Sequence, residues 1–233
     1  HTQFDYMAHK IQNLIQTNYI NEILKKEAQL KALETQINPH FLYNTLESIN
    51  WRAKAIHESS ISSMVESLGY LLRSTLSGQD ASHTLGEELM LTSHYINIQK
   101  FRFEDRLQYE TSIAPDLPLD FPFPRLIIQP LVENAVSYGP ERSTDSCHIK
   151  VSISIEGCNL IIHVKNSGSQ FEEDLLSKLE KGAITPRGFG IGLLNIDKRI
   201  HLSHGPDFGL KLYNEGDMAV AKIILPYTSH KTP

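Results

Sequence analysis

The spacing of apolar residues divides the chain into a helical first part and a second part in which helices and strands alternate. Within residues 3–30, apolar side chains recur at alternating spacings of three and four, at Phe4, Met7, Ile11 and Leu14. This spacing is typical of the seam between two paired helices. An ordinary amphipathic helix gives the same pattern over so short a stretch, so both interpretations fit this segment.

Two further apolar stripes predict a helical hairpin. The first helix is expected from residue 29 to about 55, continuing through Pro39, with a stripe of Leu42, Leu46, Ile49, Ala53 and Ile56. The second is expected to begin at Ser59 or Ser60 and to end at Ser77-Gly78, with a stripe of Ile61, Val65, Leu68 and Leu72. A hairpin alone rarely hides both stripes, so we expect two copies to form a dimeric four-helix bundle.

The second part of the chain predicts an α+β fold. Thr84 and Glu87 have the spacing of a capping box, which predicts a helix from there to about Phe103. Alternating apolar positions predict strands, and apolar stripes predict helices. The expected strands are 107–113, 149–155, 160–164, 210–214 and 220–225, and the expected helices are 126–138, 171–181 and 191–202. Such interleaving predicts a mixed, mostly antiparallel sheet covered on one face by helices.

Composition narrows the possible functions. The formal net charge of -5 and the absence of a basic cluster give no reason to expect nucleic-acid binding. Cys147 and Cys158 fit neither a disulfide framework nor a metal-binding spacing, which favours a reducing compartment. No apolar run approaches the roughly 18–20 residues that cross a bilayer. We therefore expect the chain to be soluble, and its start without methionine suggests a fragment whose missing part could include a membrane sensor.

His40 is the first candidate for chemistry. It directly follows Pro39 in the run Gln36-Ile37-Asn38-Pro39-His40, and a proline inside a helix costs roughly 3 kcal/mol. At about 100° per residue, His40 lies opposite the apolar stripe and shares its face with Asn44 and Glu47. These two polar residues are therefore candidates for orienting or deprotonating His40.

A second candidate is the glycine-rich segment that leads into a helix. Gly188, Gly190 and Gly192 alternate with other residues and are followed by Leu193. This spacing exposes consecutive backbone N–H groups at a helix N-terminus, which is the geometry that holds phosphate oxygens. A dinucleotide-binding fold would need a strand immediately before these glycines, and residues 182–186 do not form a strand pattern.

Two polar interruptions of apolar segments complete the set. Glu133 and Asn134 interrupt an apolar helix, and buried polar groups of this kind could hold Mg²⁺ with its waters and nucleotide phosphates. A satisfied amide near a helix end explains Asn134 equally well. Asn166 and Gly168 end a buried strand, where the polar side chain could read the edge of an adenine base. A plain turn explains that segment as well.

Together these motifs resemble the sensor histidine kinases of the LytS/YesM type, from Leu30 to Pro226. The most specific pieces are QINPHFLYNTLESI at 36–49, IQPLVENAV at 128–136 and GFGIGLLNIDKRI at 188–200. The resemblance implies an N-terminal signalling helix at 1–28, a dimerisation and phosphotransfer hairpin at 29–80, and a Bergerat-type ATP-binding domain at 82–233. It implies the cytoplasmic portion of a bacterial membrane protein, acting as a homodimer with a response regulator as its partner.

The resemblance also implies roles for individual residues. His40 would be the phosphoacceptor and Asn134 the Mg²⁺ ligand. Asn166 would read adenine, and the cofactor ATP would lie against residues that the motifs share. Those expected nucleotide-binding residues are Glu133, Asn134, Ser137, Asn166, Gly168, Gly188, Gly190, Gly192 and Leu193.

Several positions depart from the family pattern. Asn166 stands in place of the usual aspartate, and Gln170 in place of the usual glycine. Ser137 replaces a basic residue, and Met218 lies where Gly-Thr is usual. Each change weakens the expected nucleotide affinity without removing the phosphate loop or the metal ligand. The main hypothesis is therefore an ATP-dependent protein-histidine kinase, and the alternative is a degenerate kinase that serves as a dimeric signalling adaptor.

Overall fold

The computed structural model describes residues 38–76, 83–141, 145–180 and 190–228. The chain divides into two compact units, residues 1–48 and 49–233, and each is described by itself. The expected N-terminal seam at Phe4–Leu14, the Ser77-Gly78 helix end and Gly188 lie outside the described residues. Within the described part, no helix is both long and apolar enough to cross a membrane.

Helix α2 (Pro39–Ala55) begins at Pro39, so the expectation of a helix running through this proline is wrong. Asn38 is not helical, and its side-chain Oδ1 accepts a hydrogen bond from the backbone N–H of Phe41 at 3.2 Å. This is the bond of an N-cap residue. Proline has no N–H to donate, and none is needed at the first helical position, so Pro39 fits here without breaking a helix. His40 therefore lies in the first turn of α2.

In the second unit, the last turns of α2 contact α3 (Ser59–Leu76) through polar side chains. Ser62 Oγ donates to Asn50 Oδ1 at 2.6 Å, and Asn50 Nδ2 donates to Glu66 Oε1 at 3.1 Å. Lys54 also pairs with Glu66 at 2.8 Å. Several apolar side chains of these two helices remain exposed in the single chain, namely Ile49, Trp51, Ile56, Ile61 and Leu68.

A five-stranded sheet follows the helices, as expected for an α+β fold. Its strands are β1 (Leu107–Ile113), β2 (Cys147–Glu156), β3 (Asn159–Ser167), β4 (Gly209–Glu215) and β5 (Met218–Pro226). The spatial order is β1-β2-β3-β5-β4. Strand β1 pairs with β2 in parallel, and the other three pairs are antiparallel.

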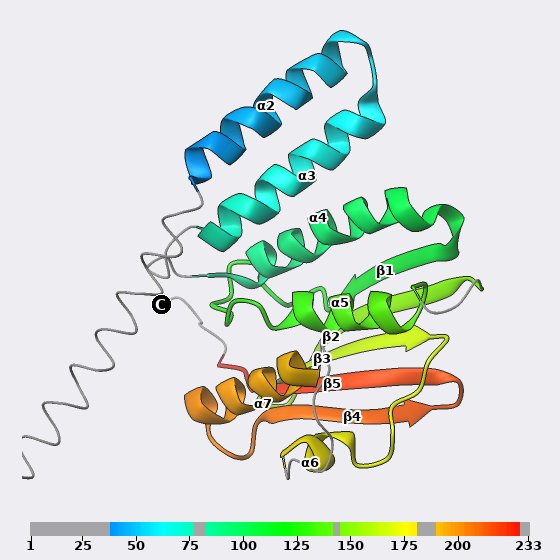
Figure 1. Ribbon diagram of the computed structural model, residues 1–233. Helices are drawn as coiled ribbons and strands as arrows, with labels where there is room; N and C mark the ends of the chain where they lie inside the picture. The colour runs from blue at the N-terminus through cyan, green and yellow to red at the C-terminus, as the bar shows by residue number, and fades with distance from the viewer. Residues whose placement is uncertain (1–37, 77–82, 142–144, 181–189, 229–233) are drawn as a thin grey trace, which may run out of the picture. The chain divides into compact units, whose positions relative to one another are not determined.

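Helices cover one face of this sheet, as Figure 1 shows. The helices of this part are α4 (Leu85–Phe103), α5 (Ile128–Tyr138), the short α6 (Leu175–Glu180) and α7 (Gly190–His204), with a 3-10 turn η1 at Glu104–Arg106. Helix α5 packs on β2 and β3, and α7 packs on β4 and β5, while α4 contacts β1 and α5. Their apolar faces and the inward side chains of the strands form one continuous core.

Helix α4 begins with the capping box that the sequence predicts. The Thr84 side chain accepts from the Glu87 N–H at 3.2 Å, and the Glu87 carboxylate accepts from the Thr84 N–H at 3.0 Å. Both bonds satisfy donors that a helix start leaves open. One turn into this helix stands Glu88, whose side chain is fully buried.

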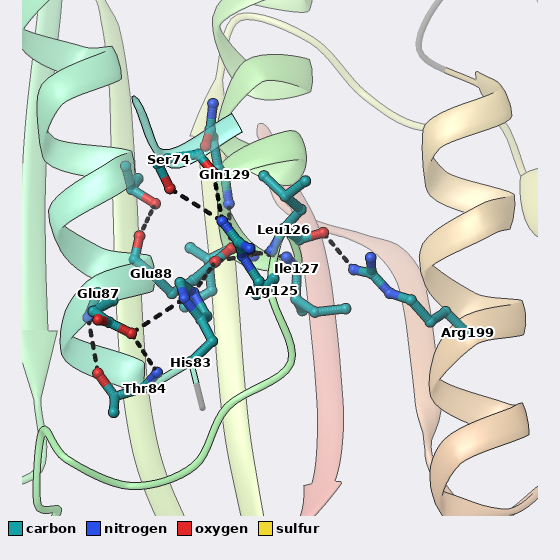
Figure 2. Close-up of polar contacts among 12 residues, drawn as sticks. Ser74, His83, Thr84, Glu87, Glu88, Arg125, Leu126, Ile127, Gln129 and Arg199 are labelled. Carbon is teal, nitrogen blue, oxygen red and sulfur yellow. Dashed lines mark hydrogen bonds and ion pairs between the residues drawn. The ribbon is translucent and has the colours of Figure 1, made fainter. Parts of the chain in front are cut away.

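Helix α5 has no cap of its own, and Glu88 takes that place (Figure 2). Its Oε1 accepts from the backbone N–H groups of Ile127 and Ile128, both at 2.8 Å, and from that of Gln129 at 3.3 Å. Its Oε2 accepts from the Leu126 N–H at 2.9 Å and lies 2.9 Å from His83 Nε2. A side chain of α4 thus fixes the start of α5.

These contacts predict a pH-dependent contribution of Glu88 to stability. Burial alone would raise the pKa of Glu88, but hydrogen bonds from His83 and the backbone amides outweigh it and lower the pKa. The folded protein therefore binds this proton less tightly than the unfolded chain does. The contribution is complete above the carboxyl pKa of the unfolded chain, about 4.3, and is lost as pH falls below it.

We expect Glu88→Gln to lower the free energy of unfolding at pH 7 by roughly 2–4 kcal/mol. The difference from the wild type should shrink as pH is lowered from about 5 to about 3. Urea denaturation over this pH range measures it. The matched control is Glu87→Gln, an exposed neighbour that undergoes the same chemical change. A difference that stays constant across this range would contradict the prediction.

Candidate functional site

Asn134 lies in the middle of α5 with its side chain 6% exposed. Its Oδ1 is buried and has no hydrogen-bond partner in the part of the chain that the structure describes. An unpaired buried acceptor costs about 1–3 kcal/mol, so such an atom requires an explanation. A carboxamide oxygen is among the ligands that Mg²⁺ accepts.

Glu133, beside Asn134, is half-buried and makes different contacts. Its Oε1 accepts a hydrogen bond from Gln129 Nε2, one helical turn earlier, at 2.9 Å. Burial raises the pKa of Glu133, and the Gln129 bond opposes that shift. Burial, followed by the charges of Glu133 and Glu141, also raises the pKa of Tyr95 on α4. Glu133 therefore lies close to α4.

Asn166 is buried near the end of β3, with its side chain 4% exposed. Its Nδ2 donates to the carbonyl oxygen of Ser167 at 3.2 Å and to Ser169 Oγ at 3.0 Å. An amide nitrogen carries two hydrogens, so these two bonds use both of them. The group left for a ligand is the Oδ1 acceptor, which is also what an aspartate would offer.

Two glycines bring the end of α5 close to the end of β3. Gly168 follows Asn166 closely and has φ of 86°, a conformation that favours glycine. A Cβ added there would lie 3.9 Å from the Cα of Gly139, which ends α5. A Cβ on Gly139 would itself clash with Cys147 Sγ of β2, so the packing of this helix end on β2 requires glycine. The elements that carry Asn134 and Asn166 therefore meet at these ends.

Ser137 lies one turn after Asn134 on α5 and bonds to the protein itself. Its hydroxyl donates to Glu141 Oε2 at 3.0 Å, and Glu141 Oε1 pairs with Arg102 Nη1 at 2.6 Å. A serine hydroxyl can accept as well as donate, so this bond leaves acceptor capacity.

The glycine-rich segment is described only in part. Gly188 lies outside the described residues, and Gly190 is the first residue of α7. A Cβ at Gly192, in the first turn, would meet nothing within 4 Å in the described structure. Leu193 is 4% exposed and packs into the hydrophobic core. Leu193 anchors the start of α7, and its side chain faces protein.

His40 is exposed in the first turn of α2, and Asn44 is its neighbour one turn later. Asn44 Nδ2 lies 3.3 Å from His40 Nδ1 and 3.4 Å from Nε2. The prediction placed Glu47 on the same face, but no hydrogen bond joins Glu47 to His40 among the described residues. Among the described residues, Asn44 is thus the one whose side chain lies within hydrogen-bonding distance of the imidazole.

The sequence interpretation did not single out Glu88. Helical periodicity did not indicate its capping role, because the backbone N–H groups that it accepts from are 38 to 41 residues away. The signal available was a charged residue between apolar positions, Leu85 and Leu91, on a helix with a buried face. Buried carboxylates need hydrogen-bond donors, which would have prompted a search for them.

Comparisons with known proteins agree with the motifs. Residues 28–107 match the family described as histidine kinase. Residues 120–227 match the family described as histidine kinase-, DNA gyrase B- and HSP90-like ATPase. The chain is 40% identical to the sensor histidine kinase YesM of Bacillus subtilis over 222 residues, 95% of this chain. It belongs to the sensor histidine kinases of the LytS/YesM type.

A second relative is the sensor protein LytS of Oceanobacillus iheyensis, 34% identical over 213 residues, which is 89% of this chain. The chain spans 37% of YesM and 36% of this LytS. Among solved structures, the catalytic domain of histidine kinase ThkA is similar with a TM-score of 0.49 and 19% identity. That match covers 63% of this chain and 95% of the ThkA domain.

The contacts of Asn166 predict the effect of restoring an aspartate. In Asn166→Asp a carboxylate oxygen would face the Ser167 carbonyl, 3.2 Å away, where an N–H now donates. We expect the free energy of unfolding without nucleotide to fall by about 1–3 kcal/mol. Urea denaturation measures it. Asn159→Asp, at the start of the same strand, should change stability by less than about 0.5 kcal/mol. Equal losses in both variants would contradict this account of Asn166.

The unpaired oxygen of Asn134 predicts an unusual response to truncation. Without nucleotide, Asn134→Ala should leave the free energy of unfolding within about 0.5 kcal/mol or raise it, because it removes an unpaired buried acceptor and alanine favours a helix. Val132→Ala, fully buried on the same helix, should lower it by about 1–3 kcal/mol. Thermal and urea unfolding of both variants provide the comparison. A loss above about 1 kcal/mol in Asn134→Ala would show that the oxygen has a partner within the protein.

Proposed function

We propose that this chain is the kinase portion of a two-component sensor: it transfers the γ-phosphoryl group of Mg-ATP to His40 and then to an aspartate of a response regulator. The observation that carries the proposal is the buried Oδ1 of Asn134, which has no partner among the described residues. Membership in the sensor histidine kinase family supports the same conclusion.

Asn134 would hold the metal. Its Oδ1 suits Mg²⁺, which keeps several waters and takes few protein ligands besides the phosphates. The described residues contain no group of three histidine, cysteine, aspartate or glutamate side chains that could hold a metal ion. A site completed by substrate phosphates and water agrees with that composition. When bound, Mg²⁺ would neutralise charge on the phosphates during transfer.

The phosphates would be held by backbone donors at the start of α7, where a Cβ at Gly192 would meet nothing within 4 Å among the described residues. Asn166 Oδ1 would accept a hydrogen bond from the adenine amine, because both Asn166 amide hydrogens are used within the protein. The Glu133 carboxylate accepts a hydrogen bond from Gln129. Glu133 would therefore affect nucleotide binding through its charge or through the position of α5.

His40 would act as the nucleophile. One imidazole nitrogen attacks the γ-phosphorus, the bond from that phosphorus to the bridging oxygen breaks, and ADP leaves. Asn44 would orient the ring through its amide. His40 lies in the first turn of α2, and a helix N-terminus favours the negative charge that the phosphoryl group brings.

A homodimer and an upstream membrane sensor belong to the same proposal. The apolar side chains exposed on α2 and α3, with Trp51 at 73% and Ile56 at 67%, are suited to burial against a second copy. The chain spans little more than a third of relatives that are named as sensors. The remaining length of such a protein would carry the sensing part, and this chain would be its cytoplasmic portion.

The alternative function is a signalling adaptor that dimerises without transferring phosphate. The departures from the family pattern favour this alternative. One of them, Gln170, has a structural role. Its Nε2 donates to the Gly216 carbonyl oxygen at 2.9 Å and ties two turns of the protein together. Incubation of the chain with γ-labelled ATP distinguishes a kinase from an adaptor.

The chain incubated with Mg²⁺ and γ-labelled ATP should acquire an acid-labile label, and His40→Asn should abolish it. The matched control is His57→Asn at the α2–α3 turn, where His57 has φ of 58° and asparagine tolerates that conformation. It should be labelled like the wild type. Acid-stable label, or label on His40→Asn, would defeat the kinase assignment, and nucleotide binding without any label would favour the adaptor.

A further inference from the structure

Glu88 has a consequence for the nucleotide site that goes beyond the proposed function and rests on it. We propose that Glu88 is a positioning residue for that site: by fixing the start of α5, its buried carboxylate sets the position of Asn134 and thereby the affinity for Mg-ATP. Glu88 itself does not touch the nucleotide. It acts through the helix that carries the metal ligand.

A count of hydrogen-bond donors at the start of α5 supports this role. A helix leaves four backbone N–H groups without helical partners, here those of Ile127, Ile128, Gln129 and position 130. Position 130 is a proline and has no N–H to satisfy. Glu88 accepts from the other three and also from Leu126, just before the helix. A single carboxylate therefore satisfies every open donor at this helix start.

The charge of Glu88 matches this position. A helix N-terminus carries about half a positive charge, and a buried carboxylate needs such compensation. His83 Nε2 lies 2.9 Å from the second carboxylate oxygen and supplies a further partner. The guanidinium of Arg199 lies near enough for the Glu88 charge to act on its pKa, against the larger effect of burial. An uncharged side chain of the same shape would replace only part of this stabilisation.

The turn before α5 is held on other sides, so it cannot simply shift to follow a change at Glu88. Leu126 has φ of 54°, which is uncommon for a residue with a branched side chain. Its carbonyl oxygen accepts from Arg199 Nη2 of α7 at 2.5 Å. Arg125 donates to the Ser74 carbonyl oxygen of α3, also at 2.5 Å. Figure 2 shows these contacts converging on the turn.

The distance from this turn to Asn134 is short for a rigid helix. Asn134 follows Ile128 by six residues, which places it about 9 Å further along the helix axis at 1.5 Å per residue. Its neighbours on α5, Leu131, Val132 and Ala135, are packed in the core. A change in the direction of the first turn of α5 would therefore be carried to Asn134.

A purely structural role for Glu88 predicts something different. If Glu88 only stabilises the fold, its replacement lowers the unfolding free energy but leaves the nucleotide affinity of folded molecules unchanged. A double-mutant cycle with Asn134 separates the two roles. Residues that act independently give additive changes in binding free energy, and residues that act through one group do not.

The experiment measures the dissociation constant for Mg-ATP by calorimetry, well below the unfolding transition. It compares the wild type, Glu88→Gln, Asn134→Ala and the double variant. We expect Glu88→Gln to weaken Mg-ATP binding by roughly 10-fold or more, as loss of a residue that orients a metal ligand does. In the Asn134→Ala background the same substitution should weaken binding by less than about 2-fold. The control Glu87→Gln should bind Mg-ATP within about 2-fold of the wild type.

The possible failures are distinguishable. If the wild type does not bind Mg-ATP, the proposed function fails and the inference falls with it. If the wild type binds and Glu88→Gln binds equally well, or the cycle is additive, only the inference is overturned. If Glu88→Gln does not fold, Glu88→Asp replaces it, since aspartate keeps the charge but is one methylene shorter. In the same cycle, Glu88→Asp and Asn134→Ala should still give non-additive changes in the free energy of Mg-ATP binding, smaller than those expected for Glu88→Gln. Additive changes would overturn the inference.

Discussion

The buried carboxylate of Glu88 is the constraint on which the second unit depends. A carboxylate with no solvent exposure is unfavourable unless its charge is compensated, and here the compensation is the start of another helix together with His83. The two elements need each other, since α5 has no cap without Glu88 and Glu88 would be an unpaired charge without α5. The position of α5 relative to α4 is therefore fixed by the hydrogen bonds of Glu88 at one end and by apolar packing along the rest.

This arrangement also decides which helix start remains for an anion. The N-terminus of α5 is filled by a protein carboxylate, so it offers no site for phosphate. Helix α7 begins at Gly190 with open backbone around Gly192. Phosphate oxygens therefore belong at α7 in the proposed function, and α5 contributes a side chain, Asn134, from its middle. In that proposal, α5 would contribute to metal binding and α7 to phosphate binding.

The sequence predicted the elements whose signals are local. The Thr84–Glu87 capping box marked the start of α4, and alternating apolar residues marked β2 and β3. Pro39 was misplaced, because an apolar stripe on both sides suggested one continuous helix, whereas Asn38 caps a helix that begins there. The Glu88 cap could not be predicted, since it joins residues about 40 positions apart and periodicity carries no information about such partners. The contact of Asn44 with His40 could be predicted from the sequence, because residues four apart share a helix face.

In the proposed function, the departure at Asn166 would remove a charge and keep a hydrogen-bond acceptor for the base. An asparagine free to rotate could present either a donor or an acceptor to a base, and would recognise the base ambiguously. Here the Ser169 hydroxyl and the Ser167 carbonyl take both amide hydrogens, which fixes the orientation and leaves Oδ1 for the ligand. The charge that aspartate would bring to this bond is worth roughly 1 kcal/mol, or a factor of about five in affinity. The Ser169 hydroxyl is the side-chain partner in this arrangement, and in the proposed function it would help an asparagine to take the place of the acid.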